Sequence, residues 1–138
     1  MKKTNSVLLI EDDEDDQSFF IEAISGIQNT VLCHIACNGK EAIDKLKNSI
    51  VLPDIIFTDI NMPLMNGIEC FLEIVKNPRT KNIPVVFLST DTGQKAHVFQ
   101  LGAKGFIQKP TDFHILSKQL SQMIVSIAST EMVGINGE

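Results

Sequence analysis

The chain has 138 residues, a hydrophobic fraction of 43% and a net charge of −5, which suit one soluble globular domain with a real hydrophobic core. Its 12 Lys and Arg residues are scattered, so no basic patch is available for a nucleic-acid backbone and we expect no DNA partner. No apolar run approaches the ~18–20 residues that span a bilayer or the ~7–15 residues of a secretory signal, so we expect a cytoplasmic protein that does not bind membranes.

Short β-rich apolar runs alternate with segments of helical periodicity along the chain. The apolar runs predict five strands, at residues 7–10, 31–36, 55–58, 85–88 and 105–108. Apolar residues at helical spacing predict helices at about residues 20–27, 43–50, 68–75, 92–101 and 113–127. Alternation of strands and helices at this spacing indicates βαβ units and therefore a parallel sheet.

The predicted strands differ in how their apolar residues are spaced. Three of them are continuous apolar runs, as expected for strands that helices cover on both faces, whereas residues 31–36 alternate as an edge strand does. This predicts a flavodoxin-like doubly wound (βα)5 fold with a five-stranded parallel sheet in the order 2-1-3-4-5. Its ligand site would lie at the carboxyl ends of the strands, beside the switch point between strands 1 and 3. We expect a single domain over residues 1–138, with its core at about 6–128 and a loosely ordered tail at 130–138.

Polar and charged residues stand directly after four of the five predicted strands. Six acidic residues, 11–16, follow the first strand, Asp59 follows the third, Ser89 the fourth and Lys109 the fifth. Because these strand ends open at one edge of a parallel sheet, carboxylates, a hydroxyl and an ammonium should converge on one crevice. The carboxylates would repel one another there unless a cation or Lys109 compensates for their charge.

This set of residue types points to a particular chemistry. Carboxylate oxygens without His or Cys nearby suit Mg²⁺, which keeps several of its waters. A cation with a lysine opposite it can stabilise the oxygens of a phosphoryl group during transfer, and a carboxylate can act as the nucleophile. The residues and their predicted positions therefore suggest phosphoryl transfer to an aspartate.

The acidic run also has a purely structural interpretation. Asp13 can be the N-cap of the first helix, with residues 14–16 in a first turn where negative charge is favourable. We expect this to hold for residues 13–16, because it still leaves Glu11 and Asp12 at the strand end to bind a metal.

The other features have structural interpretations as well. Asp59 can be a turn residue, Ser89 can be a satisfied core hydroxyl, and Lys109 before Pro110 carries little information alone. Their occurrence together at matching strand ends favours the functional interpretation.

Four segments of the chain resemble the receiver domains of two-component response regulators. They are LIEDD at 9–13, IFTDINMPLMNG at 56–67, PVVFLS at 84–89 and GAKGFIQKP at 102–110. The resemblance covers about residues 6–128, and the order and spacing of the segments make it specific. Because only a short tail follows the last predicted helix, the chain is similar to the stand-alone, chemotaxis-type regulators without an output domain.

The resemblance implies a role for the acidic residues. Asp59 would be the phosphoacceptor. The cofactor would be Mg²⁺, for which Mn²⁺ can substitute. It would be bound by Asp12 directly, by Glu11 through water, by Asp59, and by the backbone carbonyl of Asn61.

The resemblance also implies the residues of a switch. Lys109 would contact a phosphoryl oxygen, and Ser89 has the hydroxyl that follows the phosphoryl group. Phe106 stands at the aromatic position that turns inward on activation. Gly67 would permit the turn into the third helix, and members of the family have a cis peptide bond before the position of Pro110.

The partners that the resemblance implies are proteins. A sensor histidine kinase or a histidine phosphotransfer protein would supply the phosphoryl group, and a downstream protein would bind the switched surface. The chain would be a monomer or a phosphorylation-dependent dimer. It would be a signalling domain and no enzyme beyond self-catalysed phosphotransfer and autodephosphorylation.

Two departures from the family pattern affect what can be carried over. Ser89 and Phe106 are 17 positions apart, about two fewer than is usual in the family, so the fourth helix or its loop is shortened. Thr90 occupies a position often held by Ala or Gly, and its bulk is expected to slow access to Asp59.

Three rival functions fit the sequence less well. A phosphatase of the haloacid dehalogenase class would need a second Asp where this chain has Asn61, and room for a cap domain. A flavodoxin-like redox protein would need a Ser/Thr/Gly-rich loop after the first strand and aromatic residues to stack on flavin, but the chain has six acids there and no Trp or Tyr. A receiver used only as a scaffold would lack part of the reactive set, and all of it is present: Glu11, Asp12, Asp59, Ser89 and Lys109.

Overall fold

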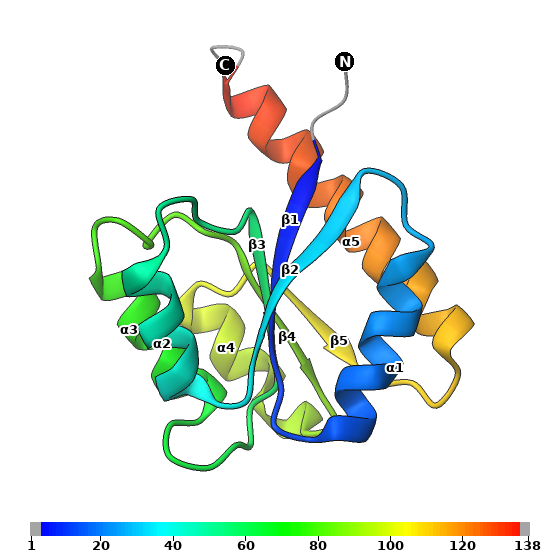
Figure 1. Ribbon diagram of the computed structural model, residues 1–138, viewed down its shortest axis with the longest axis horizontal. Coiled ribbons are helices and arrows are strands. Elements are labelled where there is room, and N and C mark those ends of the chain that lie inside the picture. Colours follow the sequence, from blue (N-terminus) through cyan, green and yellow to red (C-terminus); the bar gives the residue numbers. More distant parts are fainter. Residues whose placement is uncertain (1–3, 136–138) are drawn as a thin grey trace.

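Five parallel strands form the centre of the molecule. The computed structural model describes residues 4–135, with side chains up to Thr130. The strands are β1 (Asn5–Ile10), β2 (Thr30–Ala36), β3 (Ile55–Thr58), β4 (Val85–Ser89) and β5 (Gly105–Gln108). They are ordered β2-β1-β3-β4-β5 (Figure 1), which confirms the predicted fold class and strand order.

Helices cover both faces of this sheet. They are α1 (Glu14–Ser25), α2 (Gly39–Asn48), α3 (Gly67–Lys76), α4 (Lys95–Leu101), preceded by a 3-10 turn at Thr92–Gln94, and α5 (Phe113–Ile135). Helices α1 and α5 pack together on one face, and α2, α3 and α4 lie on the other (Figure 1).

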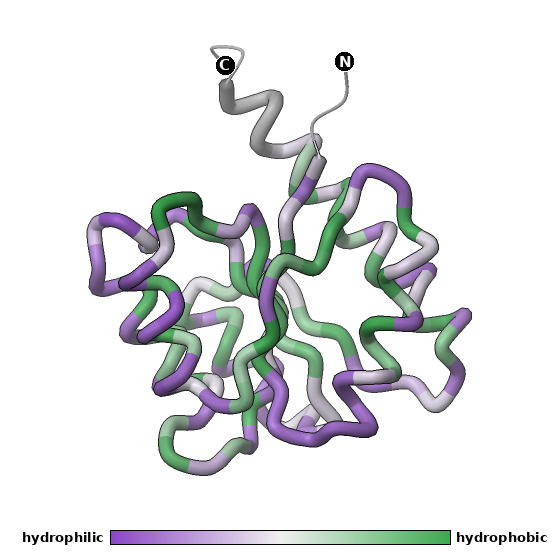
Figure 2. Tube along the Cα trace, in the orientation of Figure 1, coloured by the Kyte–Doolittle hydropathy of each residue, from purple (hydrophilic) through white to green (hydrophobic). Residues whose placement is uncertain are grey.

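Two hydrophobic cores follow from this arrangement, one on each side of the sheet. One joins alternate residues of the inner strands to α1 and α5, and the other joins the remaining strand residues to α2, α3 and α4. Apolar residues accordingly concentrate along the strands and the inner sides of the helices (Figure 2). Strands β3 and β4 are buried along their whole length, whereas Val31 of β2 is 48% exposed, as expected for an edge strand.

Side-chain caps fix where three helices begin. The Asp13 side chain accepts a hydrogen bond from the Asp16 amide at the start of α1, which confirms the predicted N-cap. Asn38 caps α2 in the same way, and Asn66 with Glu69 forms a capping box on α3. Helix α1 starts four positions after the end of β1 and α3 nine positions after the end of β3, both at the edge of the sheet where the site was expected.

Two predictions need correction. Helix α5 continues to Ile135, past its predicted end at about residue 127, so residues 130–135 are helical; that the tail is loosely ordered stays a prediction, and residues 136–138 lie outside the described residues. Gly134 weakens a helix but does not end it. No peptide bond in the described part of the chain is cis, so the predicted cis bond before Pro110 is wrong; trans is the favoured form of X–Pro bonds by about 0.5–1 kcal/mol.

No helix within residues 4–135 combines the length and apolar character needed to cross a membrane. The expectation of one domain over residues 1–138 stays a prediction.

Candidate functional site

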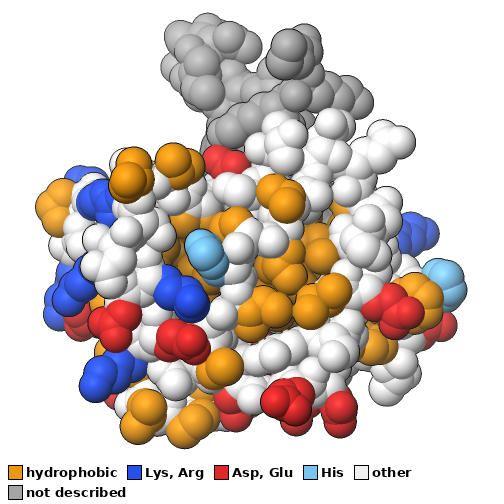
Figure 3. All heavy atoms as spheres, viewed as in Figure 1, with side chains coloured by type: hydrophobic (Ala, Val, Ile, Leu, Met, Phe, Trp, Pro, Cys, Tyr) orange, Lys and Arg blue, Asp and Glu red, His pale blue; other side chains and the backbone are white. Residues whose placement is uncertain are grey.

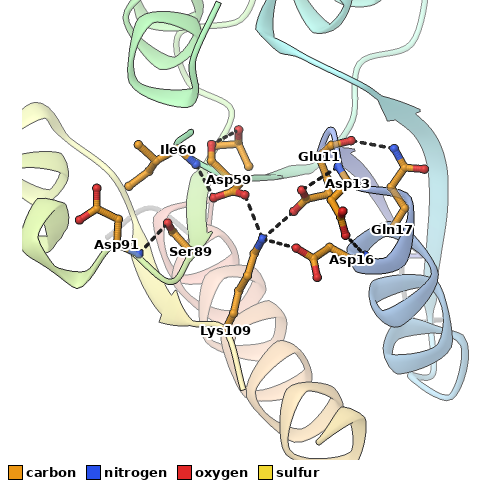
Figure 4. Close-up of polar contacts among 10 residues, drawn as sticks. Glu11, Asp13, Asp16, Gln17, Asp59, Ile60, Ser89, Asp91 and Lys109 are labelled. Carbon is orange, nitrogen blue, oxygen red and sulfur yellow. Dashed lines mark hydrogen bonds and ion pairs between the residues drawn. The ribbon is translucent and has the colours of Figure 1, made fainter. Parts of the chain in front are cut away.

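The ammonium of Lys109 lies among three carboxylates at the carboxyl edge of the sheet (Figure 4). Its Nζ is 2.9 Å from Glu11 Oε1, 2.7 Å from Asp16 Oδ2 and 2.9 Å from Asp59 Oδ2. An ammonium has three N–H donors, and each can donate to a different carboxylate here. The structure therefore brings together Glu11, Asp59 and Lys109 as predicted, and adds Asp16.

Backbone hydrogen bonds between neighbouring strands hold these residues at one level. The amide of Glu11 donates to the carbonyl of Ala36, and the amide of Asp59 donates to Ile10, at 2.9 and 3.0 Å. The amide of Lys109 donates to Ser89 at 3.1 Å. Each residue thus extends the sheet pairing by one step, which aims its side chain into the crevice beyond the strands.

Acidic side chains gather on the surface where β1 ends and α1 begins (Figure 3). The site itself is less exposed than that surface, because the side chains of Lys109, Asp59 and Glu11 are only 15%, 12% and 3% exposed. Charges in such a place are poorly screened by water, so their mutual attraction and repulsion are stronger than at the open surface.

Asp59 has one carboxylate oxygen for each of two partners. Its Oδ2 accepts from Lys109, and its Oδ1 accepts from the amide of Ile60 at 2.7 Å. These contacts hold the carboxylate in a fixed orientation at the carboxyl end of β3.

Glu11 is buried, and burial has the largest effect on its pKa. Burial raises the pKa of Glu11 to about 7, although the hydrogen bond and charge of Lys109 and the amide of Asp13 act in the opposite direction. The charge of Asp59 adds to the increase. The site without a cation therefore carries a carboxyl group that resists ionisation near neutral pH.

We expect this shift to appear as a pH-dependent stability of the metal-free protein. The folded-state pKa of Glu11 is raised from 4.5 to about 7. Its contribution to the free energy of unfolding is therefore complete below pH 4.5 and is lost as pH rises through 7. The loss is at most about 3 kcal/mol. Urea unfolding with chelator at pH 5, 6, 7 and 8 measures it.

The control for this measurement is Glu11→Gln, which cannot titrate and should flatten the slope between pH 5 and 8. Equal slopes in the two proteins would show that Glu11 titrates normally.

For the pKa of Lys109, hydrogen bonds outweigh burial. Burial lowers the pKa of Lys109, but the hydrogen bonds to Asp16, Asp59 and Glu11 together outweigh it, and the net pKa is raised. Lys109 is thus a permanent positive charge at neutral pH, held in contact with the carboxylate of Asp59.

The carboxylates fit a divalent cation. Glu11, Asp16 and Asp59 each bring one carboxylate oxygen within 4.8 Å of the others. When all three are ionised, their negative charges exceed the single positive charge of Lys109, and oxygen donors of this kind suit Mg²⁺. Asp12 and Asn61 are exposed beside Glu11 and Asp59, and their roles as metal ligands stay predictions.

The remaining predicted site residues lie in or directly after β4 and β5. Ser89 is 1% exposed, and its Oγ accepts a hydrogen bond from the amide of Asp91 at 3.1 Å. Phe106 is partly buried against the core under α4, and Thr90 is exposed. Ser89 is the last residue of β4, one position later than the predicted end of that strand.

Asp16 is the residue that the sequence did not assign to the site. The sequence predicts a purely structural role for it, as one of the first-turn residues 14–16 behind the Asp13 cap, and its amide does take part in the cap. Its side chain, however, reaches Lys109. A signal was present in the sequence, since side chains in the first turn of a helix tilt toward the helix N-terminus and so back to the strand edge.

The comparisons with known proteins bear on this geometry. The family model of the response regulator receiver domain matches residues 7–121. The chain belongs to this family. A curated relative, a protein-glutamate methylesterase/protein-glutamine glutaminase of Methanosarcina mazei, is 35% identical over 82% of this receiver and 32% of its own length. The receiver thus spans about a third of the length of the curated relatives it matches.

Two solved structures show the same fold as the receiver. The phosphorylated cyanobacterial phytochrome response regulator RcpA is 27% identical, with a TM-score of 0.78 over 91% of this chain and 95% of that one. The CheX–CheY–BeF3–Mg complex from Borrelia burgdorferi includes a chain that is 28% identical, with a TM-score of 0.77 over 89% of this chain and 88% of that one.

Proposed function

We propose that this receiver takes a phosphoryl group on Asp59 in a Mg²⁺-dependent reaction. The observation that carries the proposal is the contact of Lys109 with the Asp59 carboxylate at the end of β3, beside the buried Glu11. A nucleophile, a fixed cation and further carboxylates are thereby gathered in one poorly solvated crevice. The phosphorylated state named for RcpA supports the same chemistry here.

The transfer step uses few groups. A carboxylate oxygen of Asp59 forms a bond to phosphorus. The bond from phosphorus to the donor atom breaks and leaves its electrons on the donor, which is a histidine nitrogen of a kinase or an oxygen of a small phosphodonor. Lys109, already 2.9 Å from Asp59 Oδ2, can donate to a phosphoryl oxygen. The amide of Ile60 keeps the attacking carboxylate oriented.

Glu11, Asp12, Asp59 and the backbone carbonyl of Asn61 would hold Mg²⁺ in this receiver. When bound, Mg²⁺ supplies positive charge that offsets the carboxylates and the oxygens of the transferring group. The complex named for the Borrelia burgdorferi structure, which includes Mg²⁺ and BeF3, supports this assignment.

Incubation with acetyl phosphate tests the proposal. With Mg²⁺ present, intact-mass spectrometry should show one added phosphoryl group per chain, and excess chelator should prevent the addition. Asp12→Ala should raise the Mg²⁺ concentration needed for half-maximal labelling by about tenfold or more. Labelling that continues in chelator would contradict the proposal.

Phosphorylation is proposed to act through Ser89 and Phe106. The phosphoryl group would attract the Ser89 hydroxyl by a charge-assisted hydrogen bond, replacing its present contact with the Asp91 amide. The movement leaves space for Phe106 to turn inward and reshapes the surface of α4, β5 and α5. For such a switch, the interaction free energy of the phosphoryl group must differ by about 1–3 kcal/mol between the states with Phe106 turned outward and inward.

Ser89→Ala is therefore expected to separate phosphorylation from the response. Labelling of Asp59 should continue, while the phosphorylation-induced NMR shifts at Phe106 and its neighbours should shrink. Ser89→Thr keeps the hydroxyl and should keep the shifts. Full-size shifts in Ser89→Ala would show that the hydroxyl takes no part.

The partners of the proposed reaction are proteins. A histidine kinase or a histidine phosphotransfer protein would supply the phosphoryl group, and the complex named for CheX and CheY supports a downstream protein partner. Because α4 is short, with seven residues, β5 and α5 are the expected docking surface. A cytoplasmic location and the absence of DNA binding remain predictions, as does a monomer or a phosphorylation-dependent dimer.

A further inference from the structure

Asp16 is the closest of the three carboxylates to the ammonium of Lys109. The distance from Nζ to Asp16 Oδ2 is 2.7 Å, against 2.9 Å to each of Glu11 and Asp59. It differs from the other two in origin, because it comes from the first turn of α1 and they come from strand ends (Figure 4). It is also 43% exposed, and therefore lies on the solvent side of the buried pair.

The backbone of Asp16 is fixed in place. Its amide donates to Asp13 Oδ2 at 2.9 Å, which is the N-cap bond of α1. The cap sets the start of the helix, and the side chain of Asp16 leaves that turn toward the end of β5.

Lys109 borders a small cavity of about 30 Å³ between α1 and α5, lined in part by Phe19, Pro110 and Leu116. Its ammonium donates to all three carboxylates, so its position depends on these polar contacts.

We propose that Asp16 is a positioning residue that holds Lys109 for phosphoryl transfer. The proposal rests on the proposed function of Asp59. Glu11 is one of the residues that would hold Mg²⁺ and Asp59 is the one that would bond to phosphorus, which leaves Asp16 as the carboxylate that can stay on Lys109. One N–H of Lys109 stays bound to Asp16, and this contact directs the other two toward the phosphoryl group.

Three variants of the full chain separate positioning from metal binding and from general charge. Asp16→Ala removes the contact, and Asp16→Asn keeps an oxygen that can accept from Lys109 without the charge. Asp15→Ala is the matched control, because Asp15 is exposed in the same helical turn and carries the same charge.

At saturating Mg²⁺ we expect Asp16→Ala to slow phosphorylation by acetyl phosphate about tenfold. Asp16→Asn should lose about threefold or less, Asp15→Ala should match the wild type, and Mg²⁺ affinity from calorimetry should change by less than about threefold in all three. A loss of Mg²⁺ affinity of tenfold or more in Asp16→Ala would make Asp16 a metal ligand and overturn the proposal. Equal rates in Asp16→Ala and Asp15→Ala would overturn it as well.

A second measurement needs no phosphorylation and so keeps this inference separate from the proposed function. In metal-free protein, acetic anhydride should modify Lys109 at least about threefold faster in Asp16→Ala than in wild type or Asp15→Ala, because the amine is less firmly held. Mass spectrometry of the Lys109 peptide gives the rates. Unchanged acylation would refute the role of Asp16 even if Asp59 accepts phosphate, whereas a wild type that cannot be phosphorylated but shows the acylation difference would refute only the proposed function.

Discussion

Asp59→Asn is expected to take up no phosphoryl group from acetyl phosphate and Mg²⁺ under conditions that label the wild type fully. The amide cannot serve as the carboxylate nucleophile, and the charge that draws Lys109 to 2.9 Å is lost. The fold should survive, because Asp59 lies beyond the last residue of β3 and its amide still donates to Ile10. Intact-mass spectrometry measures the labelling, and circular dichroism measures the fold.

Asp44→Asn is the control for this loss. Asp44 is an exposed acid on α2, so this change removes the same charge from the same type of residue away from the crevice. It should be labelled like the wild type. Labelling of Asp59→Asn at the wild-type level would place the phosphoacceptor at another residue.

Gly67→Ala is expected to lower the free energy of unfolding by about 3 kcal/mol or more, the upper end of the usual cost of overpacking. A Cβ at Gly67 would lie 1.9 Å from the carbonyl oxygen of Asp59 and 2.9 Å from its carbonyl carbon. These are backbone atoms, so no side chain can rotate out of the way. The amide of Gly67 also donates to Ile60 at 2.8 Å, which holds the two segments together.

The same substitution should also slow phosphorylation, because relief of the contact must displace Asp59 or the start of α3. Chemical denaturation measures the stability, and labelling of the folded fraction measures the rate.

Gly26→Ala is the matched control for Gly67→Ala. A Cβ at Gly26 meets nothing within 4 Å, and the residue has a φ of −90°, which alanine adopts without strain. Its stability should stay within about 1 kcal/mol of the wild type. If Gly67→Ala were as stable as Gly26→Ala, the close approach of α3 to Asp59 would not exist in solution.

The sequence alone determined the sheet and the residues at its carboxyl edge. Continuous apolar runs at 55–57 and 85–88 require cover on both faces, and this burial sets them inside the sheet. Once the order is known, the residues after each strand must share one edge, so Glu11, Asp59 and Lys109 could be brought together without coordinates. The N-cap at Asp13 also follows from local chemistry, since it depends only on the three residues after it.

Only the tertiary structure decided how side chains from different elements meet. Whether Asp16 faces solvent or Lys109 depends on the angle at which α1 packs against the sheet and α5, and periodicity gives the buried face of a helix but not that angle. The approach of Gly67 to the carbonyl of Asp59 and the raised pKa of Glu11 also depend on the packed structure. The close approach and the pKa depend on how segments pack in space, which is settled only when both cores are formed, whereas the trans bond before Pro110 follows the local preference of X–Pro bonds.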